Sequence, residues 1–222
     1  MSDGPTVLDS TVLSNFAYID DYRLLTDLPD VSTVPVVENE ISDGVETHPY
    51  LRNAFDLLHK DIQVLTPFSD EISLEGYLIE KEGLDRGEAQ VIAVAENREG
   101  VVVTDDGDAR KVAKNRGIRL TGSIGVLIRG VKRNLVDKST ADKWLKSWVH
   151  DIGFRALSKD IGVIESGAVL AFELLDISVS RGAELAGLSE DEFTDLLEQY
   201  GISSIYGPDS VEELYEDVDI DE

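Results

Sequence analysis

Acidic residues stand directly after two apolar stretches that have the character of β-strands. Asp9 follows residues 6–8, and the acidic segment 105–108 follows the valine-rich residues 101–104. The carboxyl ends of parallel strands meet at one edge of a sheet, where ligands bind. Because carboxylate oxygens and water are the ligands that Mg²⁺ and Mn²⁺ prefer, the pattern predicts a divalent-metal site at this edge.

Further acids lie where helices are expected to begin. A helix starting at Pro35 carries Glu38 and Glu40, and Glu88 lies in the first turn of a helix over 88–97, where the helix dipole favours a carboxylate. Simpler roles are open for several acids. Asp9 and Asp108 also suit helix N-caps, and Glu88 also suits a first-turn acid that only stabilises its helix.

Other catalytic chemistries lack their residues. The chain has no Cys, and none of its three His stands beside a glycine-flanked Ser. Neither a phosphate-binding glycine loop nor a dinucleotide-binding glycine motif is present. Carboxylate and metal chemistry is therefore the hypothesis that the residues favour.

Strands that alternate with helices must position these acids. Strands are predicted at 6–8, 62–65 and 101–104; helices are predicted at 12–17, 35–41, 50–59, 72–81, 88–97, 109–117, 121–134 and 140–153. This alternation is typical of an α/β fold with a parallel sheet.

Four separated blocks resemble one family. LDSTVLSNFA, VPVVENEI, LDRGEAQVIAVAEN and VVVTDDGDARKVAKNRGIRLTGSIGVLIRGVKRN are similar, in order and spacing, to PIN-domain ribonucleases, especially their prokaryotic, toxin-like branch. The resemblance covers about residues 5–155. It implies a three-layer α/β/α domain with a central parallel sheet and a Mg²⁺- or Mn²⁺-dependent endoribonuclease activity.

The same resemblance implies the site residues. Asp9, Glu40, Glu88 and Asp106 would be the catalytic acids, and the metal would be held by Asp9, Glu88 and Asp106 with Asp105 or Asp108 assisting. Ser10 and Asn15 match polar positions that support the site. Glu38 could replace Glu40 as the aligned acid, and the choice between Asp105 and Asp106 stays open.

The C-terminal part has a different pattern. A linker is predicted at 162–167 and an apolar helix at 168–176, followed by a helix–turn–helix pattern over 178–201 with Gly187 at the turn and Ser189 as a cap. This segment resembles the small antitoxin-like proteins encoded beside PIN toxins. We therefore expect a nuclease domain over 1–160, a small all-α helix–turn–helix-like module over 161–207 and a mobile acidic tail over 208–222.

The composition is strongly acidic. Forty-five Asp and Glu against 20 Lys and Arg give a net charge of −25, while 42% of the residues are hydrophobic, which is too many for a disordered chain. An acidic surface suits a halophilic protein, because salt screens the self-repulsion. With no Cys, no long apolar stretch and no secretion-signal pattern, we expect a cytoplasmic protein and no membrane partner.

The charge is unevenly distributed along the chain. Residues 110–160 have a net charge of +9, whereas residues 161–222 have −16. A basic stretch in an acidic protein indicates a surface for a polyanion, although a solvated helical face is equally consistent. The residues predicted to bind RNA are Arg110, Lys111, Lys114, Arg129, Lys132 and Arg133. We also expect the acidic module to contact this surface within the chain and to restrain the nuclease.

The function predicted is a divalent-metal-dependent endoribonuclease, arranged as a toxin–antitoxin-like fusion. Its expected partners are RNA, the chain's own C-terminal module and a second copy in a homodimer. Two alternatives stay open. One is a regulatory or interaction protein that keeps the scaffold with little activity, and the other is a flap-type DNA nuclease, since phosphate contacts do not distinguish RNA from DNA.

Overall fold

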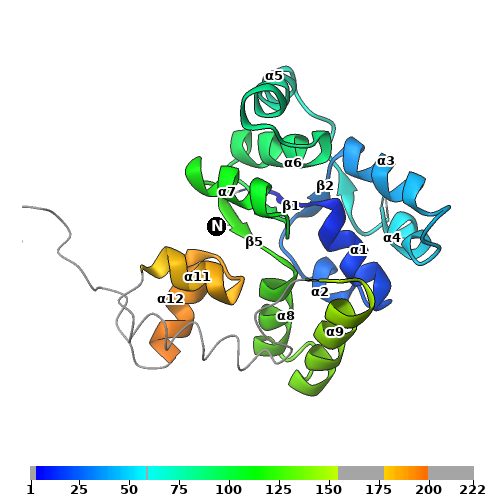
Figure 1. Cartoon of the computed structure of the whole chain (residues 1–222), viewed down its shortest axis with the longest axis vertical. Helices are drawn as coiled ribbons and strands as arrows, with labels where there is room; N and C mark the ends of the chain where they lie inside the picture. The colour runs from blue at the N-terminus through cyan, green and yellow to red at the C-terminus, as the bar shows by residue number, and fades with distance from the viewer. Residues whose placement is uncertain (1–3, 59, 155–177, 200–222) are drawn as a thin grey trace, which may run out of the picture.

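The computed structural model describes residues 4–58, 60–154 and 178–199. A five-stranded sheet in the order β3-β2-β1-β4-β5 lies at the centre, and all its strand pairs are parallel (Figure 1). The strands are β1 (Thr6–Leu8), β2 (Val31–Thr33), β3 (Gln63–Val64), β4 (Val101–Val103) and β5 (Arg119–Thr121). The predicted α/β fold with a parallel sheet is confirmed.

Helices connect every pair of successive strands, and two more, α8 and α9, follow β5. They are α1 (Ser10–Tyr18), α2 (Arg23–Thr26), α3 (Pro35–Gly44), α4 (Leu51–Leu57), α5 (Ser69–Tyr77), the π-helix η1 (Leu78–Glu82), α6 (Arg86–Asn97), α7 (Gly107–Asn115), α8 (Ser123–Lys132) and α9 (Lys138–Asp151). The three predicted strands are observed, and β2, β5 and α2 are additions that the sequence pattern did not predict.

The helices form two layers around the sheet. Helices α5, α6 and α7 lie on one side, and α1, α2, α8 and α9 lie on the other (Figure 1). The connections run outward from the middle in opposite directions, from β1 to β2 and from β4 to β5, so the topology reverses between β1 and β4. Ligands of such sheets bind at this reversal, beyond the carboxyl ends of the strands.

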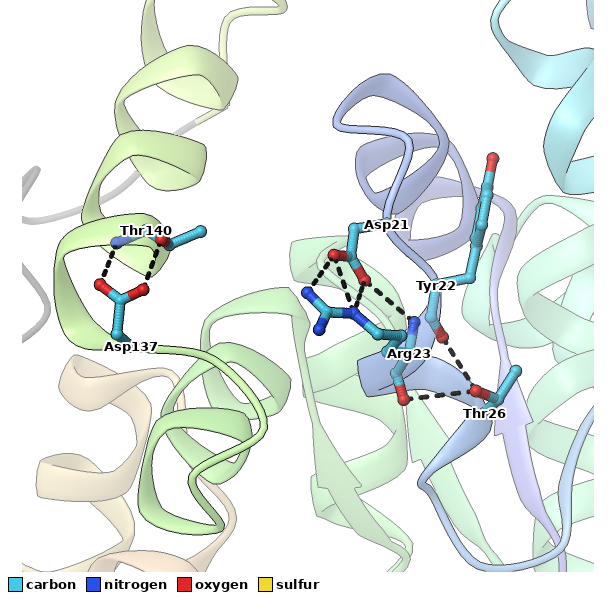
Figure 2. A network of polar contacts seen from close by, with 6 residues as sticks. All are labelled: Asp21, Tyr22, Arg23, Thr26, Asp137 and Thr140. Carbon is cyan, nitrogen blue, oxygen red and sulfur yellow. Dashed lines mark hydrogen bonds and ion pairs between the residues drawn. The ribbon is translucent and has the colours of Figure 1, made fainter.

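Local polar contacts fix where helices begin on the side of the sheet that carries α1, α2, α8 and α9. Asp137 caps α9, because its carboxylate accepts from Thr140 N at 3.0 Å and from Thr140 Oγ1 at 2.7 Å (Figure 2). Beside it in the same view, Asp21 pairs with Arg23 at the start of α2 at 2.6 Å. Such contacts stabilise helix ends but involve none of the predicted site residues.

Two more helices lie in the C-terminal part, α11 (Val179–Ala186) and α12 (Glu190–Gln199), joined at Gly187. We call this pair the hairpin. Gly187 has φ +72°, a conformation that favours glycine, and Ser189 Oγ accepts from Glu192 N at 3.2 Å at the start of α12. The predicted linker 162–167, helix 168–176 and tail 208–222 lie outside the described residues.

The hairpin lies beside the sheet edge formed by β5. Thr121 Oγ1 donates to Glu192 Oε2 at 3.2 Å, and a Cβ at Gly187 would lie 3.2 Å from Ile124 Cβ. The hairpin therefore touches both the end of β5 and the first turn of α8. Within the described ranges, no helix is long and apolar enough to cross a membrane.

Candidate metal centre

The acids predicted from the sequence come together at the topological reversal. Leu8 of β1 pairs in register with Val103 of β4, so Asp9 and the segment that begins at Thr104 leave neighbouring strands at the same edge. Figure 1 shows the first turns of α1 and α7 at this edge, with α6 above it. The sheet thus brings together residues that are about a hundred positions apart in the chain.

Asp9 is buried, with a relative exposure of 2%. Its carboxylate accepts from Ser10 N at 2.7 Å, from Thr11 Oγ1 at 2.8 Å and from Thr104 Oγ1 at 2.8 Å. Burial raises the pKa of Asp9, the hydrogen bonds oppose this, and the nearby Asp106 raises it further. Asp9 also caps α1, so the two roles considered for it are compatible.

Asp106 caps α7 and faces the same cluster. Its Oδ1 accepts from Asp108 N at 2.8 Å and from Ala109 N at 2.9 Å, and its own N–H donates to Thr104 Oγ1 at 3.1 Å. Thr104 therefore links the two acids, since its hydroxyl donates to Asp9 and accepts from the backbone of Asp106. Sequence reasoning missed Thr104, although its place directly after β4 could have indicated it.

Glu88 completes the cluster from α6. Its carboxylate accepts from Asp85 N at 3.0 Å in a capping box. Burial, opposed by this hydrogen bond, together with the nearby carboxylates of Asp106 and Asp9 raises the pKa of Glu88 to about 7. The carboxyl groups of Glu88 and Asp106 also form a hydrogen bond, which raises the pKa of Glu88 because one of the two groups must hold a proton.

Glu40 reaches the cluster from α3, and a glycine makes its approach possible. A Cβ at Gly87 would lie 2.5 Å from Glu40 Oε1, so only the absence of a side chain at this position leaves room for the carboxylate. Burial raises the pKa of Glu40, a hydrogen bond with Ser10 opposes this, and Asp9 and Asp85 raise it. Glu40 rather than Glu38 is thus the acid that adjoins Asp9.

Asp105 is held in a separate polar network beside the cluster. It accepts from Ser123 N at 2.8 Å, from Ser123 Oγ at 2.5 Å and from Asn15 Nδ2 at 3.0 Å. Burial raises the pKa of Asp105, the bonds from Ser123 and the nearby Arg110 oppose this, and Asp9 raises it. Of the two acids between which the sequence left the choice open, Asp106 faces Glu88 and Asp105 supports the site.

The remaining predicted positions also have clear places. The side chain of Asn15 donates to Asp105, and the backbone oxygen of Asn15 accepts from Trp148 Nε1 of α9 at 2.7 Å. Asp108 is exposed in the first turn of α7, where its N–H donates to Asp106. Asn15 therefore lies where the sequence predicted a supporting residue, whereas Asp108 points to solvent.

A comparison with family models gives one match, which is described as a PIN domain and covers residues 5–163. The match spans more than half of the chain and includes all the acids of the cluster. The chain belongs to the PIN-domain family. PIN domains are generally nucleases, and PIN nucleases typically use divalent metal ions. No curated protein and no solved structure matches the chain.

Buried polar contacts tie together the PIN-domain helices that carry Glu40 and Glu88. Gln90 of α6 accepts from Val36 N at the start of α3 at 3.1 Å and donates to Glu75 Oε2 of α5 at 2.7 Å. Glu75 also pairs with Arg86 at 2.9 Å. Gln90 is thus a positioning residue, which sets α3 against α6.

The residues predicted to bind RNA differ in their burial and in their contacts within the PIN domain. Arg110 is half-buried and donates to the backbone oxygens of Thr104 at 3.0 Å and Thr121 at 3.1 Å. Arg129 and Arg133 of the α8 end pair with Asp27 at 3.4 Å and 2.9 Å. The exposed residues among those predicted are Lys111, Lys114, Lys132 and Arg133, of which Arg133 is paired with Asp27.

The donor set suits a divalent cation. Hard cations take carboxylate oxygens, and the cluster supplies them from Asp9, Glu40, Glu88 and Asp106. Burial raises the pKa values of Asp9, Glu40 and Glu88, and neighbouring carboxylates raise them further; a bound cation would offset this negative charge. In the part of the chain that the structure describes, however, no three His, Asp or Glu side chains already converge as ligands around one point.

The raised pKa of Glu88 predicts how stability depends on pH. Its ordinary value is 4.5 and its value in the fold is about 7, so the protonated form stabilises the fold. This contribution is complete below pH 4.5 and is lost as the pH rises through 7. Glu88→Gln keeps the acceptor for Asp85 N and removes the charge. In EDTA at pH 8 we expect its melting temperature to exceed that of the wild type.

The expected gain is roughly 2–4 °C, which corresponds to about 1 kcal/mol after a discount for the partial exposure of Glu88. The difference should shrink towards pH 4.5, as measured by thermal melts in EDTA at several pH values. Asp43→Asn, an exposed change on α3, is the matched control for removal of one negative charge. An equal gain in both variants at pH 8 would show that the effect belongs to the net charge and not to the cluster.

Proposed function

We propose that this PIN-domain protein is an endoribonuclease that depends on Mg²⁺ or Mn²⁺. The observation that supports the proposal is the group of four carboxylates, Asp9, Glu40, Glu88 and Asp106, which three helices and a strand end bring to the topological reversal of the sheet. The resemblance of the chain to PIN-domain ribonucleases favours RNA as the substrate.

The four acids have two kinds of role in this proposal. Asp9, Glu88 and Asp106 would hold the cation, and Glu40 would add negative charge beside Asp9. The chemistry that a divalent ion would supply there is a lowered pKa of bound water, which would provide hydroxide at neutral pH, and an offset to the charge on the phosphate. Three hydrogen bonds fix the Asp9 carboxylate in one position, and the caps fix Asp106 and Glu88. Such preorganisation lowers the cost of arranging ligands around substrate.

Cleavage of a labelled single-stranded RNA by the full chain tests the proposal. We expect cleavage with Mn²⁺ or Mg²⁺, none in EDTA, and slower cleavage of a DNA of the same sequence. Asp106→Asn should lose the activity while it stays folded, because Asn is also a good N-cap and keeps the start of α7. Cleavage that persists in EDTA, or that is equal in Asp106→Asn, would overturn the proposal; faster cleavage of the DNA would overturn the assignment to RNA.

The sequence also predicts that the C-terminal module restrains the nuclease. What supports this is the contact between Thr121 and Glu192, together with Glu184: burial lowers the pKa of Arg110, and the nearby carboxylate of Glu184 opposes this. An acidic element close to basic residues competes with phosphate for them. Restraint predicts that a hairpin disturbed by substitution lets RNA bind more tightly, which the Ser180→Phe variant of the next subsection tests.

A further inference from the structure

A cleft of about 560 Å³ lies between the edge of the PIN domain and the hairpin. One wall consists of α7 and β5, with Lys111, Lys114 and Arg119. The other wall belongs to the hairpin. The match to the PIN-domain family ends at residue 163, so the hairpin wall of this cleft lies outside the matched residues.

The two lysines of the first wall are available for a ligand. Both are exposed, and neither forms an ion pair with any residue that the structure describes. Nearby Arg116, by contrast, pairs with Glu96 at 2.5 Å. Among the described residues, no carboxylate therefore competes with a ligand for the charge of Lys111 and Lys114.

The hairpin wall is fixed in place but does not fill the cleft. The Thr121–Glu192 hydrogen bond and the contact of Gly187 with Ile124 hold it at the sheet edge. Ser180 of α11 lines the cleft, and its hydroxyl oxygen is buried without a hydrogen-bond partner among the described residues. A buried hydroxyl without a partner is unfavourable, so this oxygen also indicates a missing ligand.

The cleft begins next to the acid cluster. Gly107 and Arg110 of the first turn of α7 line it, and Asp106 directly precedes Gly107. A polymer bound at the cluster could therefore continue along α7 past the lysines. The volume is that of a small-ligand site, which admits a short stretch of a single strand and not a double helix.

We propose that this cleft binds the single-stranded RNA that flanks the cleaved phosphate. The phosphates lie against Lys111, Lys114 and Arg119, and the sugars and bases face the hairpin, whose acids Glu184, Glu190 and Asp191 exclude phosphate from that side. In this proposal the hairpin is a wall of the substrate groove, which is the alternative to the restraint described above. This inference rests on the proposed function, whose substrate it places.

Binding of a fluorescent single-stranded RNA in EDTA, without cleavage, tests the groove. The full chain is compared with Lys111→Ala/Lys114→Ala and with a matched double variant, Lys143→Ala/Lys146→Ala, whose lysines are exposed on α9. We expect the groove variant to bind roughly 10-fold more weakly at about 0.1 M salt. A plot of log affinity against log salt concentration has a negative slope. For the groove variant this slope should be less steep by about 1.4, because each lost single-strand phosphate contact removes about 0.7.

The α9 variant should bind like the wild type. Equal losses in both double variants, or no loss in the groove variant, would overturn the proposal. Circular dichroism at each salt concentration checks that the chains are folded.

A second variant tests the hairpin wall without a change of charge. Ser180→Phe should weaken binding and leave the salt slope unchanged, because it adds bulk inside the cleft. Ser139→Phe is its control, since Ser139 is also the second residue of its helix but is exposed and does not line the cleft. No effect, or tighter binding as restraint predicts, would overturn the part given to the hairpin.

The two proposals can fail separately. Lysine-dependent binding without metal-dependent cleavage would support the RNA-binding groove and overturn the proposed nuclease activity. Cleavage that needs Asp106 but does not depend on Lys111 and Lys114 would support the nuclease activity and overturn the groove.

Discussion

Asp9→Asn is expected to lower the rate of metal-dependent RNA cleavage by at least about 100-fold while the protein stays folded. Changes in the residues that merely support a metal ligand cost 10- to 100-fold, so the loss of a ligand charge should cost no less. The fold should tolerate the change. Asn keeps an acceptor for Ser10 N, and its amide can donate to the hydroxyls of Thr11 and Thr104, which accept as well as donate.

Single-turnover cleavage with Mn²⁺ measures the effect, and circular dichroism and thermal melting in EDTA measure the fold. Asp43→Asn again serves as the control, since it removes the same charge from an exposed position on α3. A variant at Asp9 that cleaves within a few-fold of the wild type would remove this residue from the catalytic group. So would an equal loss in Asp43→Asn.

Arg98→Met is expected to reduce the free energy of unfolding by about 3 kcal/mol, the lower end of the range for breaking a buried ion pair. Arg98 donates to both carboxylate oxygens of Glu71, at 2.6 Å and 2.8 Å, and to Thr66 O at 3.0 Å. The Glu71 side chain is only 1% exposed, whereas Arg98 keeps 20% exposure. Without Arg98, a buried carboxylate would keep only the hydrogen bond from Phe68 N.

The matched control is Arg23→Met, which removes a bidentate pair with Asp21 where the arginine is 66% exposed (Figure 2). Exposed pairs contribute about 0–1 kcal/mol, so this variant should lose little. Denaturant unfolding at pH 7 measures both. Equal losses would mean that burial of Glu71 does not determine the effect.

The pair of Arg98 and Glu71 also predicts that the fold loses stability at acidic pH. Burial raises the pKa of Glu71, but the bonds from Arg98 and Phe68 N outweigh it, and the result lies below the ordinary 4.5. Its stabilisation is therefore present above pH 4.5 and is lost as the pH falls through the lowered value. The difference between wild type and Arg98→Met should narrow in that acid range.

The strands that the sequence did not predict show what a pattern of apolar residues cannot reveal. Strand β2 reads Val-Ser-Thr, and its buried hydroxyls are satisfied by distant backbone: Ser32 Oγ donates to Thr6 O at 3.2 Å, and Thr33 Oγ1 donates to Leu8 O at 2.7 Å. A polar strand becomes favourable in the interior only through these contacts. Strand β5 is an edge strand with exposed Arg119, so it lacks an apolar run as well.

The sequence indicated the acids of the candidate site but not the residues that surround and hold them. Asp9 follows one strand, Asp105 and Asp106 follow another, and Glu88 lies in the first turn of a helix, while the resemblance to PIN domains added Glu40 and left the choice between Asp105 and Asp106 open. Thr104 and Gln90 carry no such signal, because their importance depends on which elements pack against them. The pairing of Arg129 with Asp27 could not be predicted for the same reason, since the two residues are 102 positions apart in the sequence.

Titration of the full chain with Mn²⁺ by isothermal calorimetry tests the central claim most directly. The claim is that Asp9, Glu40, Glu88 and Asp106 together form a divalent-cation site. We expect saturable binding to the wild type and to Asp43→Asn, and at least about 10-fold weaker binding to Asp9→Asn and Glu88→Gln. The same dissociation constant and stoichiometry in all four proteins would contradict the claim.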